Sequence, residues 1–94
     1  MESPPDEHRI LACLPPDERQ AAAVWAEAAR LAGELNARLS VIHLYPAGWT
    51  GPVRTHPSAW QLKTDEPMEA VGRFAARNRI THVVFAGRER TAGG

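Results

Sequence analysis

The stretch RILACLPPDERQAAAVWAEAARLAGELNARLSVIHLY, residues 9–45, decides the fold. It begins with a short apolar run, Arg9–Leu14, that two prolines end, and it closes with a second run, Arg38–Tyr45. Between the two runs apolar residues recur at helical spacing, at Val24, Ala28, Leu31 and Leu35. Strand, helix and strand in this order indicate two parallel strands joined by a right-handed crossover.

Both ends of the helix carry capping signals. Asp17 precedes it, and Gln20 stands three residues later, as in a capping box. Asn36 follows the last apolar position, where many helices end in a left-handed residue. The sequence therefore predicts a helix over Asp17–Leu35.

The rest of the chain supplies two more strands and one more helix. Pro46–Ser58 is rich in proline and glycine and is expected to be a loop, in which Trp49 either covers the sheet or stacks on a base. We favour the covering role. The alternating stretch Ala59–Lys63 predicts an edge strand, and Pro67–Arg77 predicts a helix. The continuous apolar run Thr81–Ala86 is typical of a parallel strand covered on both faces.

These elements predict a flavodoxin-like or Rossmann-like α/β fold. We expect a parallel sheet in the order 3-2-1-4, without a fifth strand and with helices on both faces. The domain is expected to span residues 9–88, between a disordered arm at 1–8 and a flexible tail at 89–94. Gly72 is expected where its helix approaches the sheet closely, because an interior helical glycine otherwise costs about 1 kcal/mol.

Composition limits the classes of function. The chain has 94 residues, which make one small domain, and its 11 basic and 11 acidic residues give a formal net charge of zero. This balance argues against nucleic-acid binding, and no apolar stretch approaches the length that membrane insertion requires. The start MESPPDEH is unlike a signal peptide, and the single cysteine, Cys13, fits a reducing compartment. A cytoplasmic protein is expected.

Two segments also carry a family resemblance: ARLAGELNARLSVIHLY (residues 29–45) and AARNRITHVVFAGRER (residues 75–90). The chain resembles a universal stress protein domain, and it is most similar to the version inside Kdp-type potassium-responsive sensor histidine kinases. The resemblance implies the strand order 3-2-1-4-5 and a regulatory role in signal transduction and stress response. It also implies that ATP, AMP or cyclic di-AMP binds after the first and fourth strands.

On this basis the candidate nucleotide-binding residues form two groups. The first follows the first strand and comprises Leu14, Pro15, Pro16 and Asp17, and the second follows the fourth strand and comprises Gly87, Arg88, Arg90 and Thr91. Backbone N–H groups and guanidiniums of the second group are suited to a phosphate, but the same residues fit a solvated polar tail.

The sequence also departs from the family pattern at these places. Asp17 is displaced from the family's usual position, and Arg90 stands where a second glycine is usual. A loop replaces the helix that usually follows the second strand, and the last helix and fifth strand are missing.

No catalytic or metal-binding group is expected, and the chain is not expected to be an enzyme. Cys13, His43 and His82 lie within strands, where Cys13 is expected to be a small buried hydrophobic residue and the two histidines to be packed and hydrogen-bonded. The acidic residues Asp65, Glu66 and Glu69 begin a helix, where the helix dipole explains them better than a metal does.

Two functions remain open. One is a sensor that binds an adenine nucleotide and reports to a kinase or another effector domain. The other is a dimerisation or docking module that has lost nucleotide binding. In either case we expect a homodimer with contacts at Val83, Val84 and Phe85, because the strand Thr81–Ala86 is expected to have a free, uncharged edge.

Overall fold

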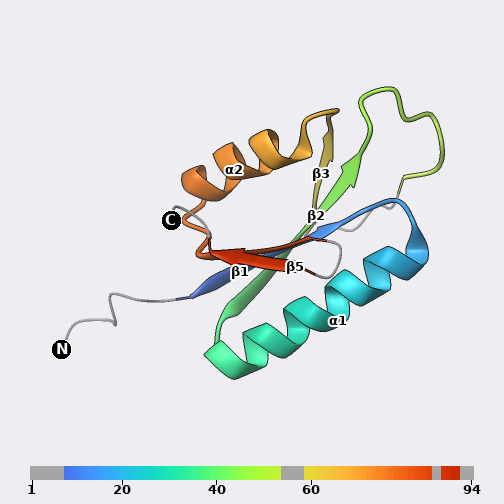
Figure 1. The fold of residues 1–94 in the computed structure, drawn as a ribbon. Coiled ribbons are helices and arrows are strands. Elements are labelled where there is room, and N and C mark those ends of the chain that lie inside the picture. The colour runs from blue at the N-terminus through green and yellow to red at the C-terminus, as the bar shows by residue number, and fades with distance from the viewer. Residues whose placement is uncertain (1–7, 54–58, 86–87, 92–94) are drawn as a thin grey trace.

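The structure is a computed structural model that describes residues 8–53 and 59–85, and the backbone of residues 88–91. Its elements follow one another as β1 (Arg9–Leu14), α1 (Glu18–Leu35), β2 (Arg38–Tyr45), β3 (Trp60–Lys63), α2 (Pro67–Arg77), β4 (His82–Phe85) and β5 (Arg88–Thr91). Figure 1 shows α1 and α2 on opposite sides of one sheet.

The strands lie in the order β3-β2-β1-β4-β5. β1 is the centre: Ile10 is in register with Leu39 of β2 on one side and with His82 of β4 on the other. β3 pairs with β2 from Trp60, opposite Ile42, onward. These four strands are all parallel, so the predicted flavodoxin-like α/β fold, its order 3-2-1-4 and its helices on both faces are confirmed.

β5 was not predicted from the sequence. It pairs with β4 in the antiparallel direction, with Arg88 opposite Phe85 and Thr91 opposite His82. The expected flexible tail is therefore wrong for residues 89–91, and the expected free edge of β4 is wrong as well. The reason is that an edge strand presents unpaired N–H and C=O groups, which the backbone of a polar segment satisfies as well as that of an apolar one. The parallel fifth strand of the resembled family is still missing from the described part of the chain.

The predicted arm and tail at the two ends of the chain are described only in part. The backbone N–H of Arg38 donates to the carbonyl of His8 at 3.1 Å, so His8, which was assigned to the arm, is held to the start of β2. The remainder of the expected arm, residues 1–7, and the end of the expected tail, residues 92–94, lie outside the described residues.

α1 begins and ends at its predicted capping residues, and α2 spans the predicted range Pro67–Arg77. The side chain of Asp17 accepts the N–H of Gln20 at 2.9 Å at the start of α1, and Asn36 ends that helix in the left-handed conformation with φ 52°. α2 begins with Pro67, whose missing N–H costs nothing in a first turn. The N–H of Asn78 closes α2 by donating to the carbonyl of Phe74 at 3.0 Å.

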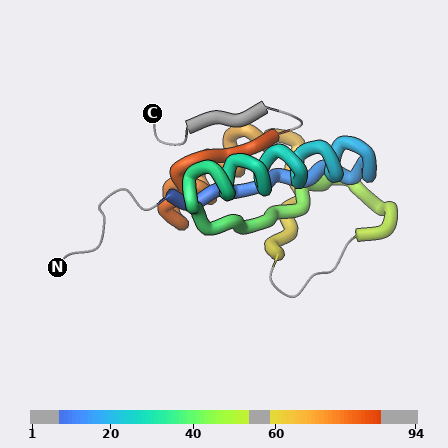
Figure 2. The backbone as a smooth tube through the Cα atoms, turned by 90° about the horizontal axis from the view of Figure 1, so that it is seen from below, coloured from blue at the N-terminus to red at the C-terminus, as the bar shows by residue number. Residues whose placement is uncertain are grey.

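The sheet separates two hydrophobic cores. On the α1 side, β1 contributes Ile10, Ala12 and Leu14, which pack against buried residues of the helix: Ala21, Val24, Ala28 and Leu31. On the α2 side, Leu11 and Cys13 of the same strand pack against Val71 and Ala75. Figure 2, seen from the side of α1, shows that helix lying along the sheet. Each large side chain buried in this way contributes roughly 1.5–3 kcal/mol.

The expectation for Gly72 is wrong. A Cβ atom built on this residue meets no atom within 4 Å, and the residue is exposed. α2 instead contacts the sheet through Val71 and Ala75, which are 1% and 2% exposed. At a spacing of four residues these two side chains share one face of the helix, and Gly72, the residue after Val71, is turned about 100° away from Val71.

Candidate functional site

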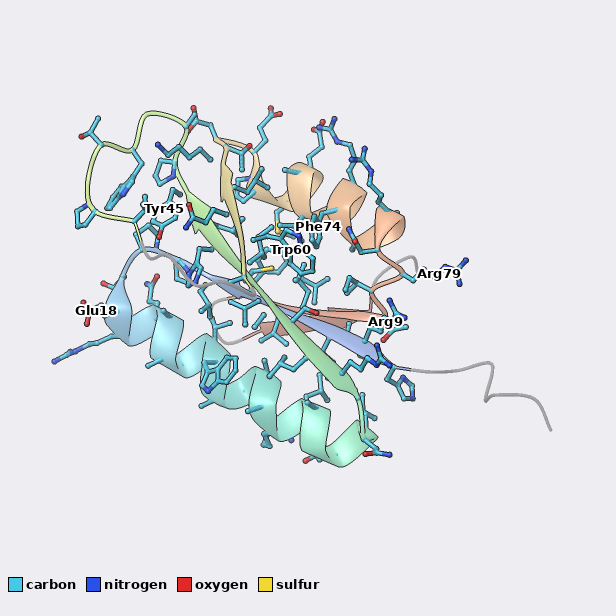
Figure 3. All side chains as sticks on the ribbon, turned by 180° about the vertical axis from the view of Figure 1, so that it is seen from behind. Arg9, Glu18, Tyr45, Trp60, Phe74 and Arg79 are labelled. Atoms are coloured by element: carbon cyan, nitrogen blue, oxygen red, sulfur yellow. The ribbon has the colours of Figure 1, made fainter. Side chains whose placement is uncertain are left out.

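The carboxyl ends of β1, β2 and β3 open onto a pocket of about 330 Å³. Its walls are mostly apolar: Pro15, Pro16, Leu44, Tyr45, Pro46, Thr64, Asp65 and Pro67. Figure 3 places Tyr45 and Glu18 at this end of the molecule and Arg9 and Arg79 at the other. The carboxyl edge is where open α/β sheets bind ligands, so this pocket is the candidate site.

The turn after β1 supplies one wall. Pro15 and Pro16 end the strand and line the pocket with their rings. Asp17 does not line it, because its carboxylate caps α1. Leu14 is 9% exposed and belongs to the core on the α1 side. Of the first predicted group, the structure therefore places only the two prolines at this pocket.

The loop after β2 supplies a second wall. Tyr45 is 4% exposed, and its ring lies against Trp49 with 5.7 Å between the centroids. The indole Nε1 of Trp49 donates to the carbonyl of Pro52 at 3.1 Å. Trp49 thus packs over the end of β2 and holds the loop in a defined shape. The wider cover of the sheet that we expected of Trp49 is not observed, because Leu39, Val41 and Ala59 line a groove on the α1 side of β2 to which Trp49 does not belong.

Hydrogen bonds join the loop after β2 to the loop after β3. Asp65 Oδ1 accepts the N–H of Ala47 at 3.0 Å, and the N–H of Thr64 donates to the carbonyl of Tyr45 at 2.8 Å. The hydroxyl of Thr64 accepts the N–H of Glu66 at 2.9 Å. These contacts fix the pocket before any ligand binds, which lowers the entropic cost of binding.

The carboxyl edge is acidic. The first turns of the helices and the loop before α2 place Asp17, Glu18, Asp65, Glu66 and Glu69 at this end of the sheet, and the described cationic residues there are Arg19, Lys63 and, at the start of β5, Arg88. An excess of carboxylates repels phosphate groups unless cations neutralise them. The field of the described residues therefore favours a ligand with little negative charge.

The residues of the second predicted nucleotide-binding group lie at different distances from the carboxyl edge, because three of them belong to β5. Gly87 lies outside the described residues. Arg88 is opposite Phe85, the last residue of β4, and so stands at the carboxyl edge. Because β5 runs back along β4, Arg90 is opposite Val83 and Thr91 is opposite His82, farther from that edge. Arg88 is thus at the same edge of the sheet as the pocket, although β4 lies between its strand and β1, whereas Arg90 and Thr91 lie farther from that edge.

The residues expected at a dimer contact are largely internal. Val83 and Val84 are 5% and 0% exposed and belong to the cores on opposite sides of the sheet. Phe85 is half-buried and packs against the core on the α2 side. β4 has a neighbouring strand on each side, β1 and β5.

Sequence reasoning missed the part of the pocket that Tyr45, Pro46, Thr64, Asp65 and Pro67 supply. The signal was present, because these residues directly follow the second and third strands. Parallel strands of one sheet present their carboxyl ends at a common edge. The family resemblance points to the first and fourth strands alone.

The other residues considered from the sequence are packed as expected. Cys13 is 1% exposed, and burial raises the pKa of its thiol to about 12, so the thiol is protonated at neutral pH. His43 is 6% exposed, and His82 is half-buried beside Thr81. Among residues 8–53 and 59–85, no three His, Cys, Asp or Glu side chains gather where they would hold a metal ion.

In comparisons with known proteins, neither a family model nor a curated protein matches this chain. The resemblance to universal stress proteins accordingly rests on the quoted residues and on the predicted strand order. Within the described part of the chain, no helix combines the length and the apolar character needed to cross a membrane.

Proposed function

We propose that the chain is a non-catalytic regulatory domain that binds an adenine nucleotide at the carboxyl edge of its sheet. The observation that carries this proposal is the pocket with proline rings and Tyr45 in its walls, at the edge where open α/β sheets bind ligands. Its volume of about 330 Å³ is at the lower end of the range for small-molecule sites. The base lies against the apolar walls, and the phosphate extends toward Arg88.

The charges at the carboxyl edge determine which nucleotides bind more tightly. Each added phosphate brings more negative charge toward Asp65, Glu66 and Glu69, and Arg88 is the nearest cation that β5 supplies. AMP therefore binds more tightly than ATP in the absence of divalent cations. Cyclic di-AMP carries a second base, for which a pocket of this size has no room.

Isothermal titration with AMP, ATP and cyclic di-AMP tests the proposal, and Arg88→Ala and Arg90→Ala form a matched pair. Arg88→Ala is expected to weaken AMP binding by about tenfold, because it removes a charge-assisted contact to the phosphate. Arg90→Ala is expected to leave the affinity unchanged, since β5 places Arg90 farther from the edge. Absence of AMP binding at millimolar concentration would show that the proposal is wrong.

A regulatory domain acts on an effector. We propose, on the resemblance to stress-protein domains of sensor kinases, that nucleotide occupancy is reported to a kinase or another effector domain in the cytoplasm. Binding would stabilise the loops that hold Tyr45 and Asp65, so their backbone amides are expected to exchange with solvent more slowly when AMP is present.

A second candidate function is dimerisation, and one observation favours it. A groove of about 520 Å³ lies on the α1 side of β2, lined by Leu14, Trp25, Leu39, Ser40, Val41, His43 and Ala59. Trp25, at its rim, is 46% exposed. This is the side of the sheet where a helix between β2 and β3 would lie. A second copy of the chain would cover the groove, and this contact replaces the one expected at Val83–Phe85.

Sedimentation velocity at micromolar concentration tests this candidate. Trp25→Lys is expected to convert a dimer to a monomer, because it places a charge in the contact. Met68→Lys is the matched control, since Met68 is also apolar and is 49% exposed, but lies on α2. A wild-type chain that remains monomeric throughout would exclude dimerisation as its function.

A further inference from the structure

A second groove lies between β3 and α2, on the other side of the sheet from α1. Its volume is about 380 Å³, and its lining residues are Ile42, Trp60, Gln61, Leu62, Lys63, Thr64, Ala70, Arg73, Phe74 and Arg77. Neither the pocket at the carboxyl edge nor the groove beside Trp25 includes Trp60 or Phe74. The groove is therefore a separate surface.

Two aromatic rings give the groove an apolar part. Trp60 and Phe74 pack edge to face, with 4.8 Å between their centroids and 71° between their planes. Figure 3 shows these two residues together beside α2. Trp60 is nevertheless 43% exposed, so a large part of its indole remains available for an apolar side chain. Exposed tryptophans in grooves are frequent anchor points for binding partners.

The charged residues of the groove are all basic. Arg73 and Arg77 lie one turn apart on α2, and Lys63 ends β3. Arg73 Nη2 donates to Glu69 Oε1 at 2.8 Å, but both side chains are largely exposed. Among the described residues, neither Lys63 nor Arg77 forms an ion pair. No aspartate or glutamate lines the groove, so an occupant with carboxylates would find complementary charge.

The backbone of β3 offers hydrogen bonds beside the same groove. β3 is the last strand of the sheet on this side within the described chain. The N–H of Thr64 donates toward β2, to the carbonyl of Tyr45. Backbone groups of successive residues in a strand point in opposite directions, so the N–H and C=O of Lys63 are directed away from β2. An extended segment lying along β3 can pair with them.

We propose that this groove binds an extended, acidic segment of a partner protein. An apolar side chain of that segment packs on Trp60 and Leu62, and its carboxylates contact Arg73 and Arg77. Its backbone pairs with that of Lys63. This proposal does not depend on nucleotide binding at the carboxyl edge, because none of the anchoring residues belongs to that pocket.

Charge distinguishes this occupant from two others. If two copies of the chain paired through their β3 edges, Lys63, Arg73 and Arg77 of both copies would come together and repel one another. A nucleic acid would meet a chain of zero net charge and an apolar surface at Trp60, whereas nucleic-acid sites carry a basic surplus. An acidic segment with apolar residues satisfies both parts of the groove.

Fluorescence anisotropy with a short labelled peptide, in which glutamate alternates with leucine, tests the proposal. Arg77→Ala is expected to weaken binding by about three- to tenfold, the effect of one charge-assisted contact at a partly exposed site. Arg19→Ala is the matched control: Arg19 is an exposed helical arginine on α1, and its loss is expected to leave the affinity unchanged. Added salt is expected to weaken binding, and the peptide is expected to shift the amide NMR signals of Trp60–Lys63 and of the last two turns of α2.

Several results would overturn this inference. Equal affinity for a peptide with glutamine in place of glutamate would show that the groove does not recognise charge. If Arg19→Ala weakened peptide binding as much as Arg77→Ala does, the peptide would be responding only to the overall electrostatic field of the protein. Sedimentation that revealed a dimer dissolved by Arg77→Glu would assign the groove to a second copy instead. Failure of the glutamate peptide to bind at millimolar concentration would refute the proposal directly.

Discussion

Trp49 lies so close to Gly51 that a side chain on the glycine would collide with the indole. A Cβ atom at residue 51 would be 2.7 Å from Cζ2 of Trp49, closer than non-bonded carbon atoms approach. On β2, the ring of Tyr45 lies 5.7 Å from the indole between centroids. Gly51 therefore allows the loop to place Trp49 over the end of β2, next to the pocket at the carboxyl edge.

Gly51→Ala is expected to displace Trp49 and destabilise the protein by about 1–2 kcal/mol, because the indole loses its packing on Tyr45 and its hydrogen bond to Pro52. Gly48→Ala is the matched control in the same loop, since a Cβ there meets no atom within 4 Å. Urea unfolding measures the change in the free energy of unfolding, and near-ultraviolet circular dichroism reports the loss of the Trp49 environment. Equal effects of the two substitutions would contradict this assignment.

Gly72→Ala tests whether this helical glycine has a packing role. Because no atom lies within 4 Å of the added Cβ, the substitution is expected to raise the free energy of unfolding by roughly 0.5–1 kcal/mol. Gly33→Ala, at an equally open position of α1, is expected to give a similar gain. Thermal unfolding of the two variants provides the measurement. A loss of stability in Gly72→Ala, but not in Gly33→Ala, would show that α2 approaches the sheet closely at Gly72, as the sequence suggested.

The elements of the fold that could be predicted are those whose sequence signals depend on residues close together in the chain. Asp17 and Asn36 mark the ends of α1 through side-chain and backbone chemistry that depends on a few neighbours. The continuous apolar residues of β1 and β4 reflect burial on both faces. β5 was not predictable in this way, because Arg88–Thr91 carries no apolar residue and pairs only because the edge of β4 is available.

The candidate site was predictable only in part. Pro15 and Pro16 were identified because they end the first strand, and the structure places them at the pocket. Tyr45 and Asp65 were missed, since their proximity depends on how the loops after β2 and β3 join, through the contact of Asp65 with Ala47. That contact spans 18 residues, a separation over which periodicity and turn signals give no information.

Asp17→Ala is expected to destabilise the protein by about 1 kcal/mol, because the N–H of Gln20 loses its acceptor at the start of α1. Asp17→Asn keeps a side-chain oxygen in the same place and is expected to retain most of the stability. Urea unfolding of both variants measures the difference. If Asp17 served mainly as a ligand contact, both variants would instead lose AMP affinity with little change in stability.

The buried thiol of Cys13 is expected to make stability fall at alkaline pH. Burial raises its pKa to about 12 in the folded protein, whereas a cysteine in an unfolded chain has a pKa of about 8.5. A raised pKa means that the folded state holds the proton more tightly. The resulting stability is fully present below about pH 8.5 and is lost as the pH rises toward 12.

In that window the free energy of unfolding is expected to decrease by up to about 1.4 kcal/mol per pH unit through this one group. Cys13→Ala removes the group, and near neutral pH it costs about 1 kcal/mol for the small cavity that it leaves between β1 and α2. The wild-type protein is therefore more stable than the variant near pH 7.5, and its advantage shrinks and then reverses as the pH rises. Urea unfolding of both proteins at several pH values measures this difference and cancels the titration of the other side chains. A difference that stayed constant across the pH range would show that the thiol does not remain protonated in the core.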